Sequence, residues 1–438
     1  MLLNRRAFLA AAATKARAVP TQHPNIVFIL TDDLGLADLA CYGAKDVRTP
    51  AIDRLAAQGV RFTQCYSNGP LCSPTRAGLI TGRYQQRVGI EYAWTPRDNG
   101  KGLLPSPYSL PKLLSGAGYR TALIGKWHLG GDPQFAPLAH GFDEFFGFLG
   151  SDHDYYSHQR LDGQPDLWDG TRPVDVPGYS TDLFADRAVR FIEQQKSGPF
   201  FLYAAFNAPH WPFQAPPRLT GTPTDVRTRA TWFDGTRQDY IAMVERLDLA
   251  IGRLLEALDR GAHSPHTLVI FTNDNGGERL SNNGPAFHQK MTLWEGGVRV
   301  PAIMRWPGHI RPRTTTAQVA ITMDFTATML AAAGVPSPTE KQLEGIDLLP
   351  IVTRQSPLRE RTFFWRYTHE PLLQKSVRQG RWKYLLDGIH ELLFDLEIDP
   401  SEHTNLAYQN PAKLRELRAL VATWEADVDR SPPPFVIR

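Results

Sequence analysis

The sequence predicts an α/β protein with a large mixed, mainly parallel sheet flanked by helices, plus a smaller C-terminal antiparallel sheet with a helix. Across residues 25–330, apolar runs rich in β-branched residues alternate with stretches of helical periodicity. This alternation is typical of parallel strands that helices cover on both faces. Residues 361–395 instead contain short alternating runs and a Gln379-Gly380 turn, which indicates antiparallel strands.

The individual elements follow from apolar runs and their spacing. Buried strands are expected at four places: residues 25–30, 119–124, 200–206 and 267–271. Helices are expected over residues 182–195 and 240–259, where apolar residues recur every three or four positions, and over about residues 412–428. We therefore predict a main α/β domain over residues 23–350 and a C-terminal sheet subdomain over residues 360–438. The length of 438 residues agrees with two or three domains.

The first 18 residues have the features of an export signal. Arg5 and Arg6 form a basic pair, a short apolar stretch follows, and Ala16-Arg17-Ala18 offers a small-residue cleavage site. This pattern resembles a twin-arginine signal and predicts a periplasmic or secreted protein, the alternative being a helical or disordered extension.

Charge and cysteine content limit the partners and the chemistry. Residues 1–18 contain four basic residues and no acid, so the formal charge falls from +3 to −1 without them. The composition therefore gives no reason to expect a nucleic-acid partner. No segment approaches the ~20 apolar residues that span a bilayer. Three cysteines are too few for a disulfide framework, and we expect Cys41 and Cys65 to be free thiols, although sequence cannot settle their pairing.

Residues 72–83 combine side chains that packing alone does not explain. A thiol, Cys72, is followed by the rigid Pro74, and the guanidinium of Arg76 stands four residues after the thiol. If a helix begins near Pro74, Arg76 lies in its first turn, beside the partial positive charge of the helix N-terminus. A nucleophile would then lie next to an anion-binding position. For an isolated cysteine, a buried structural role is the more frequent explanation.

A second informative segment spans residues 118–130. Lys126 and His128 follow a short apolar run at its carboxyl end, and their alternate spacing points both side chains to the same side. Ligands of open α/β sheets bind at the carboxyl ends of the strands. For an isolated pair, a solvated lysine and a capping histidine would be the simpler explanation.

Together these two segments resemble the signatures of the type I sulfatases, members of the alkaline phosphatase superfamily. Cys72-Ser73-Pro74-Thr75-Arg76 matches C-x-P-x-R, and residues 118–130 match G-Y-x-T-x-x-x-G-K-W-H-x-G. The resemblance extends over nearly the whole chain after residue 23. It implies that the chain hydrolyses sulfate esters, and that a separate formylglycine-generating enzyme oxidises Cys72 to formylglycine. The hydrated aldehyde would attack sulfur with one hydroxyl, and Arg76 would hold the modified side chain.

Acids and amides follow two of the expected strands, at residues 31–35 and 273–277. Such residues often cap loops, but together they also offer a set of oxygen ligands. An oxygen-only set, without histidine or cysteine at zinc spacing, selects Ca²⁺ or Mg²⁺. The resemblance agrees, since the family holds calcium with the corresponding residues and directs the modified Cys72 toward the ion. The four oxygen ligands are Asp32, Asp33, Asp274 and Asn275.

The resemblance also assigns the remaining catalytic roles. Arg76, Lys126 and Lys290 would stabilise the charge of the transferring sulfate. His210 and Lys290 would lie near the leaving-group oxygen, and one of them would protonate it. His128 would remove a proton from the second hydroxyl of the diol, which expels sulfate. Ser151 would make a further sulfate contact, whereas His288 would only flank the site.

The substrate expected is a sulfated small molecule or glycan, an aryl sulfate included. Residues 152–180 form a long polar insertion of the kind that carries specificity. Two other functions stay open: a phosphodiester or phosphonate ester hydrolase of the same superfamily, and a non-catalytic carbohydrate-binding relative. The sequence gives no oligomeric state. Aromatic and histidine side chains that could line the pocket are Tyr92, Trp94, Tyr155, Tyr156, His158 and Trp211.

Overall fold

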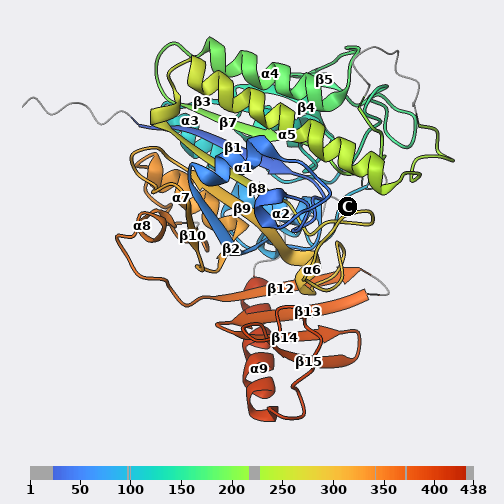
Figure 1. Cartoon of the computed structure of the whole chain (residues 1–438), viewed down its shortest axis with the longest axis vertical. Coiled ribbons are helices and arrows are strands. Elements are labelled where there is room, and N and C mark those ends of the chain that lie inside the picture. Colours follow the sequence, from blue (N-terminus) through green and yellow to red (C-terminus); the bar gives the residue numbers. More distant parts are fainter. Residues whose placement is uncertain are drawn as a thin grey trace, which may run out of the picture.

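The structure is a computed structural model. It describes residues 23–95, 98, 100–216, 227–340, 342–369 and 372–430. The expected export signal, residues 1–18, lies outside the described residues. The chain forms an 11-stranded sheet and a separate 4-stranded sheet, which Figure 1 shows with the small sheet at the bottom of the view. No helix in the described ranges has the length and apolar character needed to cross a membrane.

The large sheet is mixed and mainly parallel, which confirms the predicted fold class. Its strands follow the order β10-β2-β9-β8-β1-β7-β3-β4-β5-β6, and β11 also pairs with β2. The parallel centre consists of β1 (Asn25–Thr31), β3 (Arg120–Lys126), β4 (Glu144–Phe148), β7 (Phe200–Ala205) and β8 (Thr267–Asn273). Antiparallel to β8 and β2 (Val60–Tyr66) runs β9 (Arg299–Arg305). The remaining strands are short: β5 (Trp168–Asp169), β6 (Arg172–Pro173), β10 (Thr314–Thr316) and β11 (Ala320–Ile321).

Helices cover both faces of this sheet because its central strands are apolar on both sides. In β1, Val27 and Ile29 join one buried cluster while Ile26 and Phe28 join another, as the two-residue period of a strand requires. The helices of the first face are α1 (Pro50–Ala57), α4 (Ser180–Gln194) and α5 (Arg237–Arg260). The helices of the second face are α2 (Cys72–Thr81), α3 (Leu110–Gly116) and α7 (Thr322–Ala332).

Three helices begin earlier than expected, and α4 starts at Ser180 rather than at residue 182. The helix expected from residue 240 begins at Arg237, because Thr236 accepts a hydrogen bond from the Asp239 backbone N–H and completes a capping box. The helix expected near Pro74 begins at Cys72, so Arg76 is its fifth residue rather than part of the first turn. The short helices are α6 (Glu295–Val298), α8 (Leu349–Val352) and 3₁₀ turns at Ala40–Tyr42, Gln85–Val88, Pro133–Phe135, Pro137–His140 and Ser264–His266.

The small sheet is antiparallel, as predicted, and α9 (Pro411–Val428) packs against it. Its strands are β12 (Thr362–His369), β13 (Leu372–Gln379), β14 (Trp382–Asp387) and β15 (His390–Asp395). A buried ion cluster joins it to the main body, since Lys383 on β14 pairs with Glu295 at 2.9 Å and with Glu402 at 2.8 Å. The domain boundary between residues 350 and 360 stays a prediction.

Candidate active site

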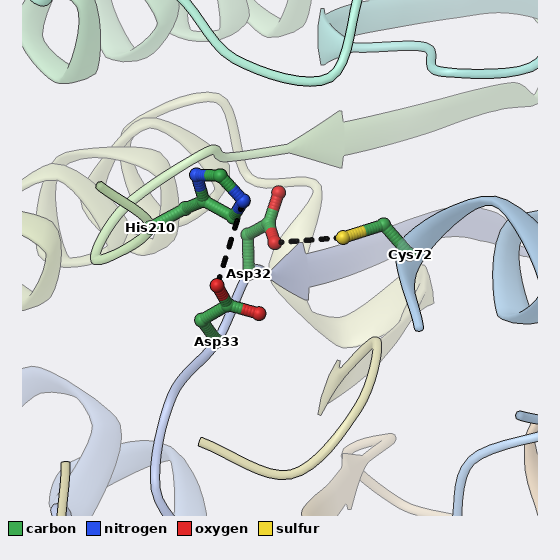
Figure 2. A group of neighbouring side chains, drawn as sticks. All are labelled: Asp32, Asp33, Cys72 and His210. Carbon is green, nitrogen blue, oxygen red and sulfur yellow. Dashed lines mark hydrogen bonds and ion pairs between the residues drawn. The ribbon is translucent and has the colours of Figure 1, made fainter. Parts of the chain in front are cut away.

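The candidate site forms where the carboxyl ends of β1, β3, β7 and β8 meet. Asp32 and Asp33 follow β1, Cys72 is the first residue of α2, and His210 lies in the loop after β7 (Figure 2). The Cys72 Sγ lies 3.5 Å from Asp32 Oδ1, and His210 Nε2 lies 3.5 Å from Asp33 Oδ2. One potential ligand atom from each of these four buried residues lies within 4.8 Å of the others.

Arg76 lies between two of the predicted metal ligands. Its Nη2 donates to Asp274 Oδ2 at 2.8 Å and to Asp32 Oδ2 at 3.2 Å. Its Nη1 donates to the backbone oxygen of Lys126 at 3.0 Å, which ties α2 to the end of β3. The guanidinium is fully buried, and such a charge persists in a protein interior only when it is paired. The hydrogen bonds of Arg76 therefore link α2 to the carboxyl ends of β1, β3 and β8.

Two lysines complete the arrangement. Lys126 Nζ lies 2.5 Å from Asp32 Oδ2, and Lys290 Nζ lies 2.7 Å from Asp33 Oδ2. Both ammonium groups are buried, and the paired carboxylates raise their pKa values against the opposing effect of burial. The lysines predicted to bind sulfate are thus charged at neutral pH.

The carboxyl groups of the site differ in their tendency to bind a proton. Burial alone would raise the pKa of Asp32, but Lys126 and His210 lower it below its ordinary value. Burial and the charge of Asp32 raise the pKa of Asp274 to about 7. Burial also raises the pKa of Asp33, although Lys290 opposes this effect. So many acids in one buried place require cations beside them.

Asn275 offers an oxygen that nothing in the described part of the chain uses. Its Nδ2 donates to Asp33 Oδ1 at 2.8 Å, whereas its Oδ1 is buried without a hydrogen-bond partner. The next residue, Gly276, has no room for a side chain, because a Cβ atom there would lie 1.8 Å from the backbone oxygen of Gly296. A buried orphan oxygen beside several carboxylates fits a hard cation such as Ca²⁺ or Mg²⁺.

The hydrogen bonds of the two histidines fix their tautomers. His128 Nε2 lies 2.8 Å from the backbone oxygen of Trp94, an acceptor, so Nε2 carries the proton and the buried Nδ1 keeps its lone pair. His210 Nδ1 lies 2.6 Å from the backbone oxygen of Trp211, so its lone pair is on Nε2. Burial, together with Lys126 or Lys290, holds the pKa of both rings well below the ordinary value. Both histidines are therefore able to accept a proton.

Cys72 is poorly suited to act as a thiolate. The residue is 1% exposed, and burial together with the charge of Asp32 raises the pKa of its thiol well above the ordinary value. Because the thiolate rather than the thiol is the nucleophile, the unmodified side chain would react slowly at neutral pH. Its neighbours on α2 are also buried as far as Ile80, so the helix is fixed inside the protein.

A cavity of about 690 Å³ opens above these residues. Cys72, His128, Ser151, His210 and Lys290 all line it. Arg76 and Lys126, which were also predicted to be catalytic, do not line the cavity; both are fully buried and paired with Asp32. The Ser151 hydroxyl donates to Asp152. Its contact with sulfate stays a prediction.

Half of the expected pocket aromatics contribute to this cavity. Tyr92, Trp94 and Trp211 line it. The predictions for Tyr155, Tyr156 and His158 were wrong, because these side chains do not line the cavity. Their polar atoms instead form hydrogen bonds with backbone oxygens of the surrounding loops. Their hydrogen bonds are those of Tyr155 Oη to the oxygens of Asn207 and His210, Tyr156 Oη to the oxygen of Ala215, and His158 Nε2 to the oxygen of Gly178.

The insertion at residues 152–180 contains both buried and exposed residues. His153 is buried and its Nε2 lies 2.9 Å from Ser180 Oγ. Part of the insertion does approach the site, since Arg160 and Trp168 line a smaller cavity of about 110 Å³ that also includes Trp94 and Ser151.

Two further sequence predictions have a structural outcome. Cys41 and Cys65 are unpaired, as expected, and so is Cys72. His288 is exposed, lies against Phe287 with ring centroids 4.4 Å apart, and does not line the cavity.

Several residues that line the cavity were not predicted from the sequence. Glu278 lies three residues after Asn275, close enough in sequence to have been considered. Phe233 and Met291 lie in loops, and Tyr367 comes from β12 of the small sheet. No local pattern marks these three, because only the folded chain brings them to the cavity.

Comparison with known proteins identifies the family. Residues 24–335 match the sulfatase family, and residues 285–424 match the C-terminal region of N-sulphoglucosamine sulphohydrolase. The chain belongs to the sulfatase family. The sulfatase is 33% identical to N-acetylgalactosamine-6-sulfatase from Sus scrofa, over 94% of this chain and 87% of that protein. It is 35% identical to arylsulfatase A from Homo sapiens, over 98% and 93%.

A solved structure has the same fold. Ps i-CgsB in complex with k-i-k-neocarrahexaose matches the sulfatase with a TM-score of 0.85 and 31% identity, over 94% of each chain. The family and its named relatives establish that the sulfatase is an enzyme that hydrolyses sulfate esters. The interpretation as a non-catalytic binding protein is therefore set aside.

Proposed function

We propose that this sulfatase removes sulfate from glycans, with formylglycine at position 72 and a Ca²⁺ or Mg²⁺ ion in the site. The observation that carries the proposal is the position of Cys72. Cys72 is the first residue of α2 and lines the cavity, and its Sγ lies 3.5 Å from Asp32 Oδ1. Arg76, Lys126 and Lys290 supply positive charge around these two residues.

Burial of Cys72 supports the modification. A protonated thiol is a weak nucleophile, whereas a hydrated aldehyde offers one hydroxyl for attack on sulfur and a second for release of the product. Because Cys72 is inaccessible in the folded chain, the formylglycine-generating enzyme must act before folding is complete.

The chain's own residues would hold the metal and the sulfate. Carboxylate and amide oxygens would hold the ion, which, when bound, would polarise the sulfate and the attacking hydroxyl. Lys126 and Lys290 would then bind sulfate oxygens, stabilising the charge that develops during transfer. The ligands we assign to the metal are Asp32, Asp33, Asp274 and Asn275.

Proton transfers follow from the tautomers. His128 Nδ1 holds a lone pair and would accept the proton of the second hydroxyl. Of the two candidates beside the leaving oxygen, Lys290 carries a proton at neutral pH and His210 Nε2 does not. Lys290 is therefore the group we assign to protonate the leaving oxygen. The proton of the attacking hydroxyl would pass to the carboxylate of Asp33 or Asp274 as the new oxygen–sulfur bond forms.

Two kinds of relative support a glycan as substrate. One is named for the 6-sulfate of N-acetylgalactosamine, and Ps i-CgsB was solved with a carrageenan-type oligosaccharide. The cavity, with Tyr92, Trp94 and Trp211 on its walls, offers aromatic faces on which sugar rings pack.

Paired substrates test the reaction. The kcat/KM for 4-nitrophenyl sulfate is expected to exceed that for bis(4-nitrophenyl) phosphate by ~100-fold, about 2.7 kcal/mol of transition-state binding. Among sulfate esters, release of sulfate from a panel of monosulfated sugars and carrageenan oligosaccharides should identify the better carbohydrate substrate. Faster hydrolysis of the phosphate diester would favour the phosphodiesterase alternative.

We also propose export through the twin-arginine route, on the sequence of residues 1–18. Replacement of Arg5 and Arg6 by lysine is expected to leave the protein in the cytoplasm, because the twin-arginine route recognises the arginine pair. Cell fractionation and immunoblotting measure the distribution, with Lys15→Arg as a charge-preserving control outside both the arginine pair and the cleavage site. Unchanged periplasmic or secreted yield in the double variant would contradict this route.

A further inference from the structure

Two carboxylates that the proposed chemistry does not use line the cavity, those of Asp98 and Glu278. Asp98 accepts hydrogen bonds from Tyr92, Thr95 and Lys101. Glu278 lines the cavity, and its Oε2 is buried without a hydrogen-bond partner among the residues that the structure describes. A buried carboxylate oxygen without a donor is costly, so an orphan oxygen at a binding cavity indicates a donor that a ligand supplies. Glu278 is not among the residues assigned to sulfate or metal.

The next residue fixes the position of Glu278 relative to the cavity rim. Arg279 donates a hydrogen bond to the backbone oxygen of Phe233, and its guanidinium lies 5.0 Å from the ring centre of Phe213. The segments that carry Glu278 and Phe233 are therefore tied together on the same side of the cavity.

Phe233 and Trp211 form an apolar shelf beside the site. Their ring centres are 4.9 Å apart, and Trp211 lies 4.4 Å from the ring of His210. The side chain of Phe233 is left 50% exposed. An exposed aromatic ring next to a carboxylate suits a sugar, whose C–H face packs on the ring while its hydroxyls donate hydrogen bonds.

We propose that Glu278 is a specificity residue for the sugar that carries the sulfate ester. Its carboxylate accepts a hydrogen bond from a hydroxyl or amide N–H of that sugar, while the ring rests against Trp211 and Phe233. Burial and the charge of Asp33 raise the pKa of Glu278 to about 7, and in its ionised form the carboxylate disfavours a second sulfate at the neighbouring position. This inference rests on the proposed glycan sulfatase function.

Variants at Glu278 test this assignment through a ratio of substrates. N-acetylgalactosamine 6-sulfate and galactose 6-sulfate offer donors, whereas 4-nitrophenyl sulfate offers none. For the sugar that wild-type enzyme cleaves better, Glu278→Ala is expected to lower kcat/KM by ~10- to 100-fold, the range for a hydrogen bond to a charged group. The loss on 4-nitrophenyl sulfate should be at least about tenfold smaller. Glu397→Gln, at an exposed glutamate, is the matched control.

A second variant separates charge from shape. Glu278→Gln keeps the size and one acceptor oxygen, so it should lose less activity on the monosulfated sugar than Glu278→Ala. It should also raise the rate on N-acetylgalactosamine 4,6-disulfate relative to the monosulfated sugar, because the repelling charge is gone.

Three outcomes would overturn the inference. Equal losses on sugar and aryl substrates in folded variants would show a structural role, and unchanged kcat/KM on the sugar would show no contact. Wild-type enzyme that cleaves 4-nitrophenyl sulfate but neither sugar would overturn the assignment of Glu278 while leaving sulfate ester hydrolysis intact. Inactivity of mature wild-type enzyme on every sulfate ester would instead contradict the proposed function itself.

Discussion

The Cys72→Ser variant is expected to release at most one product per active site and then to stop. The introduced serine has a single hydroxyl, which the surrounding cations can still activate for attack on sulfur. The product is an ordinary sulfate ester on that side chain, with no second hydroxyl for His128 to deprotonate. Steady-state turnover should fall by on the order of a thousand-fold or more, since water would have to attack a sulfur shielded by Lys126 and Lys290.

Rapid-quench kinetics and the mass of the peptide that contains position 72 measure this outcome. We expect a burst without a steady state, and a sulfated serine that accumulates. Cys65→Ser, in the neighbouring strand β2, is the matched control and should keep its steady-state rate. Many turnovers at a near-native rate, with the introduced serine shown to be unmodified, would mean that release from a diol is not the mechanism.

Removal of the divalent ion is expected to have the second-largest effect. Elemental analysis should show about one Ca²⁺ or Mg²⁺ per chain, and a chelator should lower kcat by ~1,000-fold, as expected when several kcal/mol of charge stabilisation are lost. Asp274→Asn should weaken metal binding, because it removes a charged ligand. Asp186→Asn, on the exposed surface of α4, is the control and should leave metal content unchanged.

The identity of the metal decides whether the ligand assignment holds. Activity restored by Ca²⁺ or Mg²⁺ agrees with an oxygen ligand set. One equivalent of zinc with full activity would contradict it, because it would point to coordination by the nitrogen of His210 or the sulfur of Cys72, which also lie in the cluster.

The sequence predicted those parts of the site that follow directly from strand ends. Asp32 and Asp274 come immediately after apolar runs, and the carboxyl ends of neighbouring parallel strands lie side by side. Their meeting could therefore be expected once the strands were recognised, and so could that of Lys126 at the end of β3. The prediction that Cys72 and Arg76 lie close together also holds. Although α2 begins earlier than expected, both residues belong to it.

Features that depend on tertiary contacts were beyond sequence reasoning. Tyr155 was expected in the pocket only because it is aromatic, but its hydroxyl donates to the backbone oxygens of Asn207 and His210. Tyr367 reaches the cavity from the small sheet, across a contact that no local pattern encodes. The role of Glu278 depends on an unpartnered oxygen, which only the folded arrangement reveals.

The mass of one peptide tests the central claim most directly. Trypsin should release residues 62–76 from protein made in its native host, or in a host with an aerobic formylglycine-generating enzyme. We expect the mass of an aldehyde, or its hydrate, in place of the Cys72 thiol, with Cys65 unchanged. Fully active enzyme that contains only unmodified cysteine at position 72 would contradict it.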